Sequence, residues 1–301
     1  MTRQTWLFVA AQDWMGSMAM VRSLGYPVTA VVVGPRPLAD AVATGGADDV
    51  CWVDAAGLPA EAYALSIADW RSLADAAVLA CSTDPAARVL LGAVASRRGA
   101  RLIPGVIGLR TDGDAVMVDH LVAGGDAIET VLADGPVAVI YVGDDAEPTA
   151  TTPCPVTATD ANPVAMAVPG TTPVATATGL ADAKSVVSVG RGLRGRDDVA
   201  LVAQLATKLN AEMACTMPVA EDLGWLPKER YVGRSGQQIA PQLYLAVGIS
   251  GAMQHLEGIR RVRIVAAINN DPKARIFQRA NYGVVADLHE IVPALIAQLG
   301  T

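Results

Sequence analysis

The feature that most constrains the fold is a repeated alternation of short apolar runs with segments of helical periodicity. In the first half, apolar runs at residues 5–10, 28–33, 49–53 and 77–80 alternate with helical patterns at 16–24, 38–44 and 86–98. This alternation is typical of parallel sheets covered by helices. Such strands are rich in Val, Ile and Leu, which agrees with a hydrophobic content of 52% and an aromatic content of 4%. The first half therefore predicts a Rossmann-like α/β domain with a doubly wound, open parallel sheet.

The pattern changes between residues 102 and 141. Short β-like pieces are separated there by Asp-Gly and Gly-Gly turns, which predicts hairpins or an antiparallel extension of the sheet. Residues 144–183 are rich in Thr, Pro, Ala and Asp, and so many prolines disfavour a helix. We expect an extended connection there, with one or two edge strands. The predicted domains are 1–183, which ends in this connection, and 184–301.

The second domain repeats the α/β alternation. Asp197 or Asp198 is a candidate N-cap for its first helix. Five strands in about 115 residues predict a second open, doubly wound parallel sheet. The expected strands are 185–189, 212–216, 242–247, 263–268 and 283–286, and the expected helices are 199–209, one beginning at 249–255, and 291–299.

Charge and composition exclude several classes of function. The net charge of −7 argues against nucleic-acid binding through a basic surface. No apolar run is long enough to cross a bilayer, so we expect no direct membrane insertion. The four cysteines are far apart and lack a C-x-x-C spacing, which favours free thiols in a reducing cytoplasm over a metal site.

Three glycine turns follow strands of the second domain, and the turn Gly248–Gly251 is of most interest. Ligands of open α/β sheets bind at the carboxyl ends of strands. Glycine lets backbone N–H groups approach a phosphate, which a helix N-terminus also attracts. We expect Gly248–Gly251 to hold a phosphate or pyrophosphate, with Gln254 and His255 facing the far end of the ligand. The alternative is that the glycines only turn the chain and that His255 is a core residue.

Residues Gly190–Gly195 also form a G-x-G-x-x-G pattern after a strand, with Glu212 at a suitable distance for a ribose contact. This pattern suggests a nicotinamide-dependent oxidoreductase. The predicted helix begins too late for that fingerprint, so we rank this function lower.

Four longer segments carry a more specific signal. They read VGRGL at 189–193, VGRSGQQIAPQLYLAVGISGAMQH at 232–255, AAINNDPKARIFQRANYGVVADL at 266–288 and VPALIAQL at 292–299, with a looser VAGGDAIETV at 122–131. The chain resembles the alpha subunit of electron-transfer flavoproteins, across nearly the whole second domain. The resemblance implies an FAD-binding electron carrier without catalytic residues of its own, since the flavin carries the redox chemistry.

The resemblance also implies partners. A beta subunit completes a heterodimer, a flavin dehydrogenase such as an acyl-CoA dehydrogenase donates electrons, and a quinone oxidoreductase or another redox acceptor receives them. A degenerate assembly subunit with weak flavin binding is the other alternative.

By resemblance, Ser235 is expected near flavin N5 or O4, His255 at flavin O2, and Asn269 and Asp287 toward the ribose and adenine. The expected cofactor contacts as a set are Arg191, Thr216, Met217, Val232, Gly233, Arg234, Ser235, Gly248, Ile249, Ser250, Gly251, Gln254, His255, Asn269, Asn270, Asp287 and Leu288.

The chain departs from the family pattern at Met217, where the family usually has an arginine over the flavin ring. A thioether supplies no positive charge, so we expect a lower flavin potential than in ordinary members. The alternative is that Arg234 or another cation replaces the missing charge. A smaller departure is Asn281, where the family often has Asp.

Overall fold

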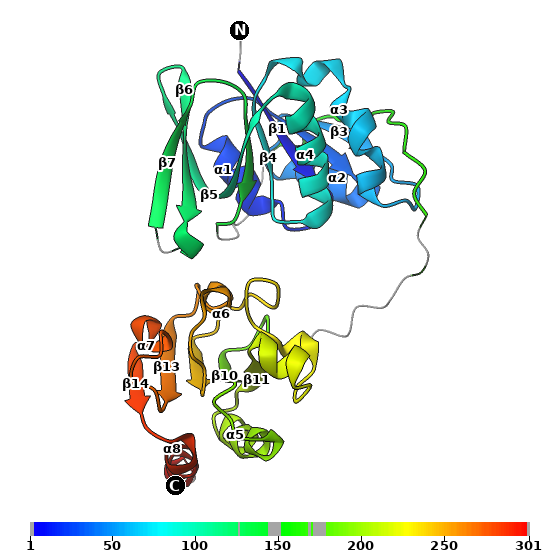
Figure 1. Ribbon diagram of the computed structural model, residues 1–301. Coiled ribbons are helices and arrows are strands. Elements are labelled where there is room, and N and C mark those ends of the chain that lie inside the picture. Colours follow the sequence, from blue (N-terminus) through cyan, green and yellow to red (C-terminus); the bar gives the residue numbers. More distant parts are fainter. Residues whose placement is uncertain (1–2, 126, 144–151, 168–169, 171–178, 300–301) are drawn as a thin grey trace. The chain divides into compact units, whose positions relative to one another are not determined.

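The computed structural model describes residues 3–125, 127–143, 152–167, 170 and 179–299. They form two compact units, Met1–Gly170 and Thr171–Thr301, both drawn in Figure 1. The composition of the connection had placed the boundary later, at 183/184. Leu180 is fully buried in a core of the second unit, so the residues that follow 178 pack with that unit.

The first unit contains the predicted parallel sheet. Its strand order is β7-β6-β5-β8-β4-β1-β2-β3-β9, and the strands from β5 through β8 and β4 to β9 pair in parallel. The bounds are β1 (Gln4–Val9), β2 (Val28–Val33), β3 (Asp49–Val53), β4 (Ala76–Cys81), β5 (Arg101–Asp112), β6 (Ala115–Val122), β7 (Ala127–Ala133), β8 (Val137–Tyr141) and β9 (Val156–Ala158).

Helices cover both faces of this sheet. The helices α1 (Met15–Arg22) and α2 (Arg36–Thr44) pack on one core, and α3 (Ala64–Ala68) and α4 (Pro85–Arg98) pack on the other. Short 3₁₀ turns lie at Ala60–Tyr63, Arg71–Asp75 and Ala123–Gly125. The predicted doubly wound architecture is confirmed for this unit.

The predicted antiparallel extension is also confirmed, because β5, β6 and β7 pair antiparallel at one edge. β8 then returns as a parallel strand between β5 and β4. The edge strand expected in the Pro- and Thr-rich connection is β9, which pairs with β3. Other parts of that connection, residues 144–151, 168–169 and 171–178, lie outside the described residues.

The second unit is a five-stranded parallel sheet of order β11-β10-β12-β13-β14. Its strands are β10 (Ser185–Val189), β11 (Glu212–Cys215), β12 (Leu243–Val247), β13 (Ile264–Asn269) and β14 (Tyr282–Val285). All five predicted strands are present, with bounds that differ by a residue or two.

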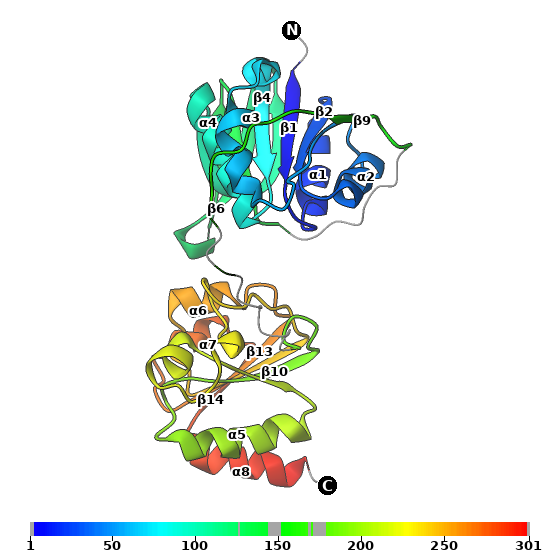
Figure 2. The same ribbon diagram turned by 90° about the vertical axis from the view of Figure 1, so that its right-hand side faces the viewer.

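Figure 2 shows α5 (Arg196–Lys208) and α8 (Leu288–Gln298) lying together on one face of this sheet. The opposite face carries the short helices α6 (Met253–Glu257) and α7 (Ile276–Arg279). A π-helical turn, Pro218–Asp222, and a 3₁₀ turn, Lys228–Arg230, lie in the connection between β11 and β12. No described helix is both long and apolar enough to cross a bilayer.

The predicted N-cap of α5 is wrong. The cap is Gly195, which has no side chain to accept a hydrogen bond from a backbone N–H of the first turn. Asp198 lies inside the first turn, and its carboxylate accepts the N–H of Arg194 at 2.7 Å. The helix therefore starts earlier than its apolar periodicity indicates, because its first three residues, Arg196–Asp198, are all charged and add no apolar position to the pattern.

Candidate functional site

The strand order places a switch point at the carboxyl ends of β10 and β12. After β10 the chain moves to β11 on one side, and β12 then lies on the other side of β10. In open α/β sheets the loops diverge at such a point and leave a crevice where ligands bind. The turn after β10 and the turn after β12 border this crevice.

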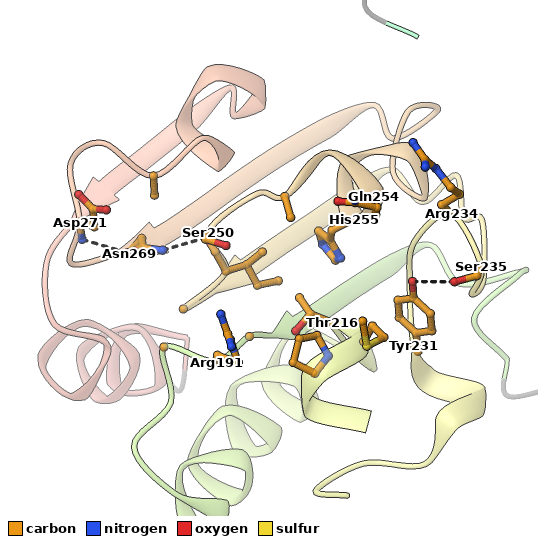
Figure 3. A pocket seen from close by; sticks show the side chains of 18 residues that line it. Arg191, Thr216, Tyr231, Arg234, Ser235, Ser250, Gln254, His255, Asn269 and Asp271 are labelled. Carbon is orange, nitrogen blue, oxygen red and sulfur yellow. Dashed lines mark hydrogen bonds between the residues drawn. The ribbon is translucent and has the colours of Figure 1, made fainter. Parts of the chain in front are cut away.

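A pocket of about 780 Å³ occupies this position, a size typical of cofactor sites. Figure 3 shows Asn269, Asp271 and Ser250 toward one end, Tyr231, Ser235 and Arg234 at the other, and His255 between them. The pocket is lined by Gly190, Arg191, Gly192, Thr216, Met217, Pro218, Tyr231, Arg234, Ser235, Gly248, Ile249, Ser250, Ala252, Gln254, His255, Asn269, Asp271 and Ala274.

The turn after β12 is held by its neighbours in the protein. Gly248 has φ +64° and donates its N–H to the Ile268 carbonyl at 2.9 Å. Its own carbonyl accepts the N–H of Gly192 at 2.9 Å. A Cβ on Gly190 would lie 2.4 Å from the Gly248 carbonyl oxygen. These glycines are therefore required by the close approach of two turns, and the N–H of Gly248 is not available to a ligand.

Other groups of the same turn are available to an anion. Among the described residues, the N–H groups of Ile249 and Ser250 have no protein acceptor. The turn is braced by Asn269, which donates to the Ile249 carbonyl at 2.8 Å. In the same described part of the chain, no carboxylate pairs with Arg191, which lies exposed beside the turn. Two free N–H groups and an unpaired guanidinium suit a pyrophosphate.

The contribution of a helix dipole is smaller than the sequence suggests. The helix expected from Ile249 begins at Met253 and has only five residues, with no side-chain cap at Ala252. The backbone donors and Arg191 therefore form the anion site with little help from α6.

The opposite end of the pocket has no unpaired cation among the described residues. Met217 lines the pocket and is 40% exposed. The guanidinium of Arg234 forms two hydrogen bonds to the carboxylate of Glu257, one of them at 2.7 Å. This pairing holds the pKa of Glu257 below its usual range. Arg234 is thus neutralised by Glu257 and does not replace the arginine that Met217 lacks.

His255 lies at the pocket but is 5% exposed. Its Nδ1 is 2.9 Å from the Val232 carbonyl oxygen, and its Nε2 is 2.8 Å from the hydroxyl of Tyr244. Burial lowers the pKa of His255 to about 4, and the hydrogen bond to Val232 offsets part of this effect. The ring is therefore neutral near pH 7, with a protein partner at each nitrogen.

Six of the residues expected to contact the cofactor lie outside the pocket lining. Val232 and Gly233 lie between the lining residues Tyr231 and Arg234 of their loop, and Gly251 packs against Ile276. Asn270 is exposed beyond β13. Asp287 caps α8 by accepting the N–H of His289, and Leu288 is buried next to it.

Asp287 belongs to a polar cluster that joins the first turns of α5 and α8. It accepts hydrogen bonds from Arg194 at 2.5 Å and from His289 Nδ1 at 2.6 Å. His289 Nε2 lies 2.9 Å from Asp198. The two carboxylates raise the pKa of His289, and the pKa values of both carboxyls are lowered.

The pocket also contains residues that the sequence did not single out, Pro218, Tyr231, Ala252, Asp271 and Ala274. Asp271 follows β13 by two residues, so the rule of strand carboxyl ends could have found it. Tyr231 enters through the connection after β11, and its hydroxyl lies 3.3 Å from the Ser235 hydroxyl. The two residues are only four positions apart, but no motif in the sequence indicates that their side chains meet.

The G-x-G-x-x-G pattern does not form a dinucleotide fingerprint. That fingerprint needs a helix opening within the glycines, whereas α5 begins at Arg196. Glu212 is the first residue of β11, so it lies at the amino ends of the strands, whereas the pocket lies at their carboxyl ends. Its carboxylate pairs with Arg230 at 2.5 Å. It therefore cannot hold a ribose at the carboxyl ends.

Comparison with known proteins agrees with the site. The family model "Electron transfer flavoprotein FAD-binding domain" matches residues 179–260, and the model "Electron transfer flavoprotein domain" matches residues 19–166. The putative electron transfer flavoprotein subunit YdiR of Escherichia coli (strain K12) is 49% identical over 120 residues, which are 40% of this chain and 38% of that protein.

Protein FixB of Escherichia coli O139:H28 (strain E24377A / ETEC) is 42% identical over 195 residues, 62% of each chain. The same values hold for Protein FixB of Escherichia coli O17:K52:H18 (strain UMN026 / ExPEC). The chain thus matches less than two thirds of the length of these relatives. Both halves of the chain match models of one family, and the pocket lies mainly in the part that matches its cofactor domain. The chain belongs to the electron-transfer flavoprotein family as an alpha-type subunit, and FAD is the cofactor of its C-terminal unit.

Proposed function

We propose that this chain is the FAD-binding subunit of a heterodimeric electron-transfer flavoprotein. A beta subunit is its partner, and it carries electrons from a flavin dehydrogenase, such as an acyl-CoA dehydrogenase, to a quinone oxidoreductase or another redox acceptor. When bound, FAD supplies the redox chemistry, while the residues of this chain bind and orient it.

The observation that carries the proposal is the division of the pocket into two chemically different ends. The free N–H groups of Ile249 and Ser250, with Arg191 beside them, suit the pyrophosphate. Ser235 lies toward the other end (Figure 3), where the resemblance puts the flavin ring, and the uncharged Met217 also lines the pocket. An elongated cofactor with an anionic middle and an uncharged ring matches this division.

The roles of the remaining predicted contacts are part of the same proposal. Asn269 braces the pyrophosphate turn and faces the ribose side. Asp287 and Leu288 lie at the start of α8 outside the pocket lining, so we assign them to the outer, adenine end of the cofactor.

The first experiment is to produce the full chain together with a beta-type subunit and to measure FAD that is retained through gel filtration. Arg191→Gln should weaken FAD binding roughly 10- to 100-fold, because a hydrogen bond to a charged group contributes about 1.5–3 kcal/mol. Arg263→Gln is the matched control, since Arg263 is an exposed arginine that directly precedes β13. It therefore lies at the amino ends of the strands, away from the pocket at their carboxyl ends.

The outcomes separate the candidate functions. One FAD per heterodimer, lost on Arg191→Gln and kept on Arg263→Gln, supports the FAD site. Bleaching of that flavin by a dehydrogenase and its substrate supports the electron-carrier role. A heterodimer that stays colourless with added FAD would instead support the degenerate assembly subunit.

A further inference from the structure

Tyr244 is a buried tyrosine whose hydroxyl has an unusual partner. It lies on β12 with no exposed surface, and its hydroxyl is 2.8 Å from Nε2 of His255. It does not line the pocket. Its hydrogen bond to His255, which lines the pocket, links Tyr244 to the cofactor site.

The chemistry of the two contacts fixes the protons on the imidazole. The Val232 carbonyl can only accept, so Nδ1 of His255 must carry a hydrogen. Nε2 of a neutral ring is then an acceptor, and the Tyr244 hydroxyl must donate to it. The reverse arrangement, with Nε2 donating to the tyrosine oxygen, needs a charged ring in a buried place.

The surroundings favour the neutral ring. Cys215 on β11 is a protonated thiol, since burial raises its pKa to about 12, and Ser188 on β10 is an uncharged hydroxyl. Glu257, two residues further along α6, is paired with Arg234, and the guanidinium of Arg260 lies 4.0 Å from the same carboxylate. Neither the described neighbours on β10 and β11 nor α6 itself offers a free carboxylate to stabilise an imidazolium.

We propose that Tyr244 is a positioning residue that holds His255 as the neutral Nδ1–H tautomer, leaving the imidazole with no N–H group to donate to a bound ligand. With Met217 in place of the usual arginine and Arg234 paired to Glu257, Arg191 is then the one arginine among the described residues lining the pocket that has no carboxylate partner. Any effect of this charge arrangement on the ring of FAD rests on the proposed function, whereas the tautomer of His255 does not.

The test uses the full chain labelled with ¹⁵N in its three histidines and reconstituted with an unlabelled beta-type subunit. Only His120, His255 and His289 then give ring signals, and a His255→Asn sample assigns one of them. We expect the wild-type ring to be the Nδ1–H tautomer at pH 7 and to remain uncharged down to about pH 5, in keeping with its pKa of about 4.

Tyr244→Phe keeps the ring and removes the hydroxyl. Without its donor, Nε2 should show the signal of a nitrogen that accepts no hydrogen bond, and the titration of His255 should move upward by about one pH unit. Tyr63→Phe is the matched control, because it removes a buried hydroxyl that donates to the Ala55 carbonyl at 2.9 Å in the other unit. It should leave the His255 signals unchanged.

A second readout is the midpoint potential of bound FAD as a function of pH. Wild type should show no inflection from His255 at or above about pH 5, whereas Tyr244→Phe should show one near pH 5, about one pH unit above the wild-type pKa of about 4. A general loss of structure would not create a new inflection.

A wild-type Nε2–H tautomer, a charged wild-type ring at pH 7, or unchanged His255 signals in Tyr244→Phe would each overturn the proposal. If Tyr244→Phe does not fold, the tautomer and charge of His255 in the wild-type protein still test the proposal. FAD content is measured on the same samples. A colourless sample with the expected His255 signals would count against the proposed function only, and a yellow sample with the wrong tautomer against the role of Tyr244 only.

Discussion

Gly251→Ala is expected to be far more damaging than an ordinary glycine substitution at a positive φ. Gly251 has φ +79°, and a Cβ there would lie 2.3 Å from the backbone nitrogen and 2.7 Å from the Cα of Ile276. Ile276 is fully buried, and its N–H donates to the Ser250 carbonyl at 3.1 Å. Neither partner in this contact is a flexible side chain, so the turn and the start of α7 must move apart.

Gly224→Ala is the matched control in the same unit. Gly224 has φ +60°, and a Cβ there would meet nothing within 4 Å. The control therefore measures the cost of the backbone conformation alone, about 1 kcal/mol. Gly251→Ala adds a backbone clash comparable to overpacking, about 1–3 kcal/mol, so its total should be about 2–4 kcal/mol.

Urea unfolding of the full chain, followed by circular dichroism, gives both free energies of unfolding. FAD retention should fall only for Gly251→Ala, because that substitution displaces the turn that carries the free N–H group of Ser250. Equal loss of stability in the two variants would refute the argument, since it would mean that the turn is not packed against Ile276 as the structure shows.

Three further predictions concern charge. Met217→Arg should raise the FAD midpoint potential by tens of millivolts, since about 1.4 kcal/mol corresponds to about 30 mV for two electrons, and a spectroelectrochemical titration measures it. Glu257→Gln should raise the potential in the same direction, because it leaves the guanidinium of Arg234 uncompensated; no change would show that this charge does not reach the flavin. His289→Gln should lower the melting temperature more at pH 5.5 than at pH 8.5. The raised pKa of His289 means that its stabilisation is complete below about pH 6.5 and is lost as the pH rises through the folded value, while its carboxylate partners, whose pKa values are lowered, keep their charge down to about pH 4. An equal loss at both pH values would contradict this reasoning.

The α/β architecture could be predicted from the sequence because parallel strands buried on both faces leave a strong signal. The runs at β2 and β10 are almost entirely Val, Ala, Ser and Thr, and each is followed by a turn and a helix. The N-termini of the helices were harder to predict from the sequence. α6 and α7 have five and four residues, too few for a periodic pattern, and the polar first turn of α5 hides its start.

The candidate site could be predicted as a place more readily than as a set of contacts. The carboxyl-end rule and the glycine turns locate the pocket at Arg191 and Gly248–Ser250. The contacts of His255 could not be predicted, because they join residues that are 11 and 23 positions apart in the sequence. The pairing of Arg234 with Glu257 spans 23 positions as well. Only the folded chain shows that the guanidinium of Arg234 is already paired with a carboxylate.

These contacts change how the absence of an arginine at Met217 is interpreted. Taken alone, a thioether in place of an arginine suggests a site that has lost one charge and that another cation can repair. Two of the candidate cations that line the pocket already have partners in the chain, Arg234 a carboxylate and His255 a hydroxyl and a carbonyl. Arg191 keeps its charge, but it lies beside the pyrophosphate turn. An uncharged ring end and a cationic phosphate end would hold FAD firmly while leaving its ring without electrostatic help on reduction. We therefore expect a low flavin potential, to which Met217, the pairing of Arg234 and the hydrogen bonds of His255 all contribute, and restoring a single arginine at 217 should recover only part of it.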